Sequence, residues 1–171
     1  MNEDPHIDID QHNRLLTVRV PYPRTLPRVG SAVLVEHDGR ALLGIRQKDP
    51  GRGDLVIPGG GVEPFETIDQ AGIREIRDET SLDIEITGRI GTYELLNRKT
   101  NTHKVIVYSR ARIVGGSLNA QTDISDLRFF SKEELASLSL SALIRNVLVD
   151  AGWLQTGNSA TELQHVGESD E

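Results

Sequence analysis

The sequence predicts an α+β domain in which helices pack against a mixed β-sheet. Runs of apolar and β-branched residues, separated by turn residues, come before and after one clearly helical segment. A second helical segment follows near the carboxyl end, so the predicted order is strands, helix, strands, helix. The 171 residues are enough for one domain with a sizeable core.

The predicted strands are short apolar runs bounded by Gly, Pro, Asn or Asp. The clearest pair flanks Asp38-Gly39, because Asp-Gly between two such runs favours a two-residue hairpin. Pro58 and the three glycines after it are expected to break regular structure. In order, the expected strands are 15–20, 30–36, 40–47, 55–57, 82–87, 89–96, 104–113 and 127–130.

Two capping signals predict where the helices begin. Thr67 is followed three residues later by Gln70, and Ser131 is followed in the same way by Glu134. The first helix would place Ile68, Gly72 and Ile76 on one stripe that can face the core, since each residue turns the helix by about 100°. The second helical region would extend to about Ala151, with Gly152 as a stop signal.

Composition excludes several classes of function. The formal net charge is -7, so the chain has no general electrostatic attraction to nucleic acid or to an anionic membrane. It has no cysteine, which excludes disulfides, thiolate zinc sites and cysteine nucleophiles. Its five histidines are scattered without ligand-like spacing. There is no apolar run of membrane-spanning length and no secretory signal pattern, so we expect a cytoplasmic protein.

The segment REIRDET, residues 74–80, carries more acid than a helix favours. Glu75, Asp78 and Glu79 are helix neighbours at three- and four-residue spacing, where like charges repel by a few tenths of a kcal/mol per pair. A solvated charged face is one explanation. The other is a metal site, because carboxylates that converge on one patch suit Mg²⁺ or Mn²⁺.

The longer stretch from Gly60 to Leu82, GGVEPFETIDQAGIREIRDETSL, distinguishes between these explanations. It resembles the signature of the Nudix hydrolases, in which fixed Gly, Glu, Arg-Glu and Glu-Glu positions recur at set spacing. Asp78 stands where the family has Glu, and Ser81 stands where it has Gly. The matching positions are Gly60, Glu66, Arg74, Glu75, Ile76, Glu79 and Leu82.

The resemblance extends over about residues 28–152 and implies a Nudix-like α/β/α sandwich. It also implies a divalent metal, Mg²⁺ with Mn²⁺ as the alternative, held by Glu75, Asp78, Glu79 and the Gly60 carbonyl, or by Gly59 in place of Gly60. Glu66 and Arg74 would form an ion pair that supports the site. Asp78 is one methylene shorter than Glu, and Ser81 would be strained if the helix ends in a left-handed conformation.

Further candidates complete the predicted site. Arg46 stands where similar proteins often carry a basic residue that meets phosphate, although a surface arginine is the plain alternative. The general base stays open between Glu75, Glu79 and the loop residues Asp123 and Asp126, which could also be simple turn residues.

The resemblance implies Mg²⁺-dependent hydrolysis of a diphosphate bond. The substrate would be a nucleoside diphosphate derivative such as a nucleoside triphosphate, a nucleotide sugar or ADP-ribose. The alternative is a catalytically weak or inactive Nudix-fold domain that binds a nucleotide-like ligand. The isomerase branch of the fold is disfavoured, because its chemistry resembles cysteine-dependent protonation and this chain has no cysteine.

The predicted organisation has three parts. Residues 1–27 form an N-terminal arm, 28–153 the Nudix hydrolase domain, and 154–171 a polar, acidic tail expected to be disordered. The small-molecule substrate is the expected partner, with no membrane and no nucleic acid. The proline-rich arm could cross to another subunit, which would make a homodimer.

Overall fold

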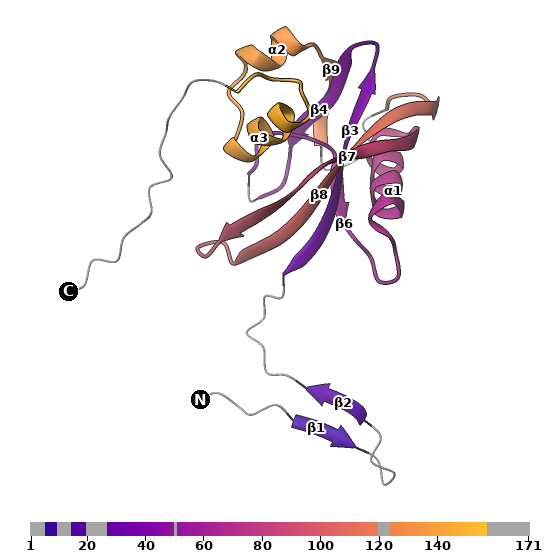
Figure 1. The fold of residues 1–171 in the computed structure, drawn as a ribbon, viewed down its shortest axis with the longest axis vertical. Helices are drawn as coiled ribbons and strands as arrows, with labels where there is room; N and C mark the ends of the chain where they lie inside the picture. Colours follow the sequence, from indigo (N-terminus) through magenta and orange to yellow (C-terminus); the bar gives the residue numbers. More distant parts are fainter. Residues whose placement is uncertain (1–5, 10–14, 20–26, 50, 120–123, 157–171) are drawn as a thin grey trace, which may run out of the picture.

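A computed structural model describes residues 6–9, 15–19, 27–49, 51–119 and 124–156. Most of them form one mixed sheet with helices against both faces (Figure 1). The strands of this sheet are β3 (Arg28–His37), β4 (Arg40–Arg46), β5 (Leu55–Val56), β6 (Gly59–Gly61), β7 (Leu82–Asn97), β8 (Thr102–Gly116) and β9 (Ile124–Phe130). The helices are α1 (Ile68–Thr80), α2 (Lys132–Ser137) and α3 (Ala142–Asp150). The predicted α+β sandwich is therefore confirmed.

The central strand of this sheet is β3. It pairs in parallel with β8 and antiparallel with β4 and β6, within the strand order β5-β4-β3-β8-β7. β9 pairs with β4 away from this path. Asp38 and Gly39 both have positive φ angles in the two-residue turn between β3 and β4, as the sequence predicted.

Side chains alternate along β3 between two cores, because successive residues of a strand point to opposite faces. Val33 and Val35 belong to the core under α1, and Ala32 and Leu34 belong to the core under α3. Ile76 of α1 is fully buried in the first core. Figure 1 shows α1 on one side of the sheet and α2 and α3 on the other. No helix in the described parts of the chain is long and apolar enough to span a membrane.

The structure corrects the sequence prediction in three places. The glycines after Pro58 do not break regular structure, because Gly59–Gly61 pairs with β3 as strand β6. The strands predicted at 82–87 and 89–96 are one strand, β7, whose register against β8 shifts at three points. The last helical region is two helices, because Ser141 caps a new helix after α2 has ended.

The capping predictions are confirmed. Thr67 and Gln70 form a capping box at α1, and Ser131 and Glu134 form one at α2. Gly152, the predicted stop, has a φ angle of 72° just after α3.

The N-terminal arm contains two short strands among its described residues. β1 (His6–Ile9) and β2 (Leu15–Arg19) pair antiparallel in a separate sheet. The sequence predicted β2 and not β1. The predicted disorder of the tail concerns mainly residues 157–171, which lie outside the described residues.

Candidate active site

The predicted site lies where β6 meets α1. Strand β6 pairs antiparallel with β3, with Gly60 opposite Ser31 and Gly59 opposite Ala32. A side chain at residue 60 would place its Cβ 2.2 Å from the carboxyl carbon of Glu75. Glycine at this position lets the carboxylate of Glu75 lie directly over the β6 backbone, and a Cβ would displace it.

Residue 59 needs glycine for a second reason. Its φ angle is 155°, and a Cβ there would lie 2.3 Å from the Ser31 carbonyl oxygen. The Gly59 N–H donates to Glu79 Oε2 at 3.1 Å. Glu79 is only 8% exposed, so this hydrogen bond fixes the direction of an almost buried carboxylate.

A fork of hydrogen bonds from Arg74 connects the loop before α1 to the carboxylates. Its Nε and Nη2 atoms donate to the two oxygens of Glu66 at 2.8 and 2.9 Å. Its Nη1 atom donates to Glu75 Oε1 at 2.7 Å, and Nη2 also donates to the Gly61 carbonyl at 3.0 Å. The predicted ion pair between Glu66 and Arg74 is present, and one guanidinium organises both the loop and Glu75.

These contacts shift the pKa values of both partners. Hydrogen bonding from Arg74, then from the backbone at Glu63, lowers the pKa of Glu66 below its ordinary 4.5. Hydrogen bonding to Glu66 and then to Glu75 raises the pKa of Arg74. Both groups are therefore held in their charged forms.

Asp78 lies apart from the other two carboxylates. It is exposed on α1 and does not line the cavity that Glu75 and Glu79 line. Ser81 ends the helix with a φ angle of 61°, the left-handed conformation that favours glycine. This conformation costs about 1–2 kcal/mol for a residue with a Cβ, as anticipated from the sequence.

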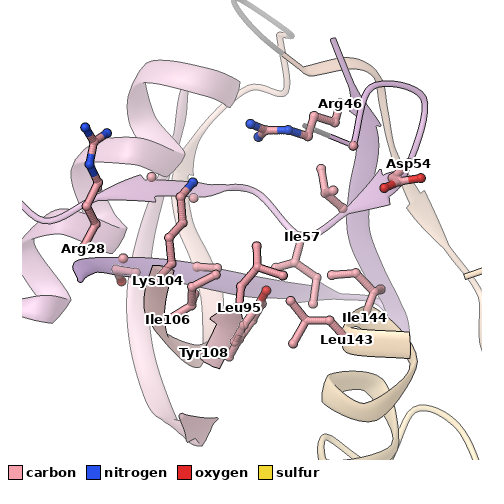
Figure 2. A pocket seen from close by; sticks show the side chains of 18 of the residues that line it. Arg28, Arg46, Asp54, Ile57, Leu95, Lys104, Ile106, Tyr108, Leu143 and Ile144 are labelled. Carbon is pink, nitrogen blue, oxygen red and sulfur yellow. The ribbon is translucent and has the colours of Figure 1, made fainter. Parts of the chain in front are cut away.

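Glu75 and Glu79 line a cavity of about 680 Å³ that residues at the start of α3 also line. Figure 2 shows Arg46, Lys104 and Arg28 extending over this cavity, with Ile57, Leu95, Ile106 and Tyr108 around its floor. Leu143 and Ile144, at the start of α3, close one side. Arg46, the predicted phosphate contact, lines this cavity together with the two carboxylates.

Of the two loop residues predicted as general base, Asp126 does not line the cavity. It is exposed and has a φ angle of 50°. Asp123 lies outside the described residues. Of the residues proposed as base, the cavity brings together Glu75 and Glu79.

The donors at this site suit a hard divalent cation. Two carboxylates face one cavity beside the backbone of three glycines, and oxygen donors of this kind match Mg²⁺ or Mn²⁺. Among the described side chains, no group of three or more Asp, Glu or His residues could hold a metal alone. Such a pair still fits Mg²⁺, which uses one or two protein carboxylates and completes its shell with water and substrate phosphate.

Sequence reasoning did not assign the other half of the cavity. Arg28 received no role, and Lys104 was not assigned to the site. Alternation along β8 places Lys104, Ile106 and Tyr108 on one face, which is the signal that could have indicated a shared surface. The side that α3 closes depends on packing between distant segments and has no local signal.

Comparison with known proteins agrees with this geometry. The family model of the NUDIX domain matches residues 25–151. The chain is 32% identical over 113 residues to an ADP-ribose pyrophosphatase of Methanocaldococcus jannaschii, covering 66% of this chain and 67% of that protein. It is 27% identical to the nucleoside triphosphatase NudI of an Enterobacter species, covering 71% and 94%. Its fold is similar to a MutT NUDIX hydrolase from Burkholderia pseudomallei, with a TM-score of 0.68, 26% identity and coverage of 74% and 98%.

Proposed function

Since the chain belongs to the Nudix hydrolase family, we propose that it cleaves the diphosphate bond of a nucleoside diphosphate derivative with the help of Mg²⁺. The substrate class includes nucleoside triphosphates, nucleotide sugars and ADP-ribose. The observation that carries the proposal is the placement of Glu75 and Glu79 at the β6 end of one cavity that also contains Arg46.

The proposed metal ligands are Glu75, Asp78, Glu79 and the carbonyl of Gly60. Bound there, a divalent cation would neutralise charge on the phosphate oxygens and lower the pKa of a water molecule. The exposed position of Asp78 makes Glu75 and Glu79 the principal pair. Mn²⁺ is the alternative cation.

The chain's own residues would hold the substrate and move the proton. Arg46 would contact a phosphate oxygen, which places the diphosphate between the cationic and acidic sides of the cavity. Water attacks one phosphorus atom, the bridging P–O bond breaks, and the leaving phosphate takes the electron pair. Glu75 or Glu79 would accept the proton of the water.

The hydrogen bonds to these carboxylates support such roles. Arg74 holds Glu75 from one side, and the Gly59 N–H holds Glu79, so neither carboxylate must reorganise before reaction. A nearly buried carboxylate also interacts more strongly with a cation than an exposed one, because solvent screens it less.

The test is a substrate panel with Mg²⁺ and with Mn²⁺. Nucleoside triphosphates, nucleotide sugars, ADP-ribose and dinucleoside polyphosphates are incubated with the protein, and products are separated by chromatography. We expect turnover of at least one class, and loss of it by orders of magnitude in Glu79→Gln. Glu94→Gln, which changes an exposed carboxylate outside the cavity, is the matched control. Full turnover by Glu79→Gln would refute the proposed site.

The exposed position of Asp78 also favours a second candidate function, a Nudix-fold domain that binds a nucleotide-like ligand without cleaving it. Calorimetry with the same panel separates the two functions. Binding without product formation, in folded protein with either metal, would support the second. A cytoplasmic location and a homodimer stay predictions.

A further inference from the structure

A pair of like charges lies on two neighbouring strands in the wall of the cavity. Arg28 of β3 and Lys104 of β8 are register partners in the parallel pair, and both line the cavity. Like charges at directly opposite positions destabilise a sheet. Neither side chain forms an ion pair or a hydrogen bond with another described residue. The fold therefore maintains a repulsive pair that it does not neutralise within the described chain.

The environment of Lys104 disfavours its charged form. Burial, then the charge of Arg46, then that of Arg28 lower the pKa of Lys104. Figure 2 shows the three long side chains over the same side of the cavity. An anion at this place would offset the repulsion and raise the pKa of Lys104.

Apolar and polar side chains surround this pair, so the wall of the cavity could contact an organic group as well as an anion. Leu95 of β7 is the register partner of Lys104 on its other side and also lines the cavity. Asn97, Thr100 and Thr102, at the tip of the β7–β8 hairpin, add polar groups to the same wall. The site thus combines cationic, apolar and hydrogen-bonding groups, which a simple charged surface would lack.

The position along β3 separates this pair from the carboxylates. Gly60, under the Glu75 carboxylate, is opposite Ser31, and Arg28 lies three residues before Ser31 on the same strand. Three strand residues span about 10 Å. Measured along the backbone, this span is longer than the separation of two adjacent phosphorus atoms in a diphosphate, so a group attached beyond the diphosphate lies within reach of the pair.

We propose that Arg28 and Lys104 form a second anion subsite, which selects substrates whose group beyond the diphosphate carries its own carboxylate or phosphate monoester. This inference rests on the proposed hydrolysis of a nucleoside diphosphate derivative and narrows its substrate class. Arg28 supplies a planar fork for bidentate contact and Lys104 a compact charge.

The first experiment tests the subsite without catalysis. Inorganic phosphate is titrated by calorimetry into the metal-free protein in EDTA, so that the carboxylate pair does not bind it. We expect Arg28→Gln/Lys104→Gln to weaken phosphate binding by about tenfold or more, because two charge-assisted contacts are lost. Arg98→Gln/Lys99→Gln, which removes the same charge from the exposed hairpin turn outside the cavity, should bind as the wild type does. Equal affinities of both double variants would overturn the subsite.

The second experiment tests selection by matched substrates in Mg²⁺. UDP-glucuronate is compared with UDP-glucose, and ADP-ribose 1″-phosphate with ADP-ribose. We expect the wild type to prefer the anionic member of one pair by about tenfold or more in kcat/KM. The pair that shows it identifies carboxylate or phosphate as the preferred group. Equal kcat/KM for the members of both pairs would overturn the inference.

The same variants separate the two proposals. Arg28→Gln/Lys104→Gln should lose the preference and retain activity on the neutral member, whereas Arg98→Gln/Lys99→Gln should keep both. A melting temperature no lower than that of the wild type excludes misfolding. If no substrate is cleaved, the hydrolase proposal fails and the phosphate titration still decides the subsite.

Discussion

The guanidinium of Arg74 donates hydrogen bonds of 2.8 and 2.9 Å to the two carboxylate oxygens of Glu66, which lies eight residues earlier in the sequence. The same side chain reaches Glu75 at 2.7 Å. A contact in the loop before α1 therefore determines how a candidate metal ligand is presented.

The first prediction concerns acid stability. The pKa of Glu66 is lowered in the folded state, so the contribution of this ion pair is complete above about pH 4.5 and is lost as the pH falls through the lower folded value. Glu66→Gln should therefore have a lower free energy of unfolding than the wild type at about pH 7, and the difference should disappear in acid. Urea unfolding across this pH range measures it. A difference that stays constant with pH would contradict the assigned cause.

The second prediction concerns the glycines of β6. Gly60→Ala should reduce kcat/KM by about tenfold or more, because the new Cβ displaces the Glu75 carboxylate. Gly61→Ala is the matched control, since a Cβ at Gly61 meets no atom within 4 Å. Steady-state kinetics on any cleaved substrate compares the two. Equal activities would show that the position of Glu75 over Gly60 is not needed.

The third prediction concerns Phe65, in the turn that Pro64 begins. The Glu66 N–H donates to the Glu63 carbonyl across this turn, and Phe65 has a φ angle of 67° with a fully exposed side chain. Phe65→Gly should stabilise the protein by about 1 kcal/mol, because glycine adopts this conformation without strain.

Phe65→Ala is the control for Phe65→Gly. It removes the aromatic ring and keeps the strained conformation, so it should leave the free energy of unfolding nearly unchanged. Denaturant melts of both variants provide the measurement. Loss of stability in Phe65→Gly would mean that the ring makes contacts not present among the described residues.

The fourth prediction concerns Asp78. If position 78 contributes a ligand, Asp78→Glu should preserve or raise kcat/KM, because the longer side chain reaches farther. Asp78→Asn should lower it by about tenfold, less than Glu79→Gln, because Asp78 is exposed and Glu79 is nearly buried. Activity against Mg²⁺ concentration measures both effects. An Asp78→Asn variant as inactive as Glu79→Gln would contradict this ranking.

Local signals in the sequence predicted the parts of the fold that depend on neighbouring residues. The capping box of Thr67 and Gln70 and the turn at Asp38 and Gly39 are built from residues within three positions of each other. Local spacing also predicted Glu75, Asp78 and Glu79 as one group on a helix turn, of which Glu75 and Glu79 line the cavity.

Parts that depend on distant partners were not predicted. The glycines of β6 form a strand because they pair with β3, which is distant in the sequence. This tertiary pairing overrides their low strand propensity. Arg28 and Lys104 meet through a parallel register that no nearby residue specifies. The solvent exposure of the Asp78 side chain depends on which face of α1 packs against the sheet.

The parallel pairing of β3 and β8 has a consequence for the order of folding. Glu36 of β3 and Arg110 of β8 form an ion pair although they are 74 positions apart, and α1 lies in the connection between their strands. Closing so long a connection carries an entropic cost before its contacts form, which slows folding. During synthesis, the segment that carries Glu75 and Glu79 is complete before β8 exists. We therefore expect the carboxylate pair to acquire its final geometry late, when β8 docks and the middle of the sheet closes.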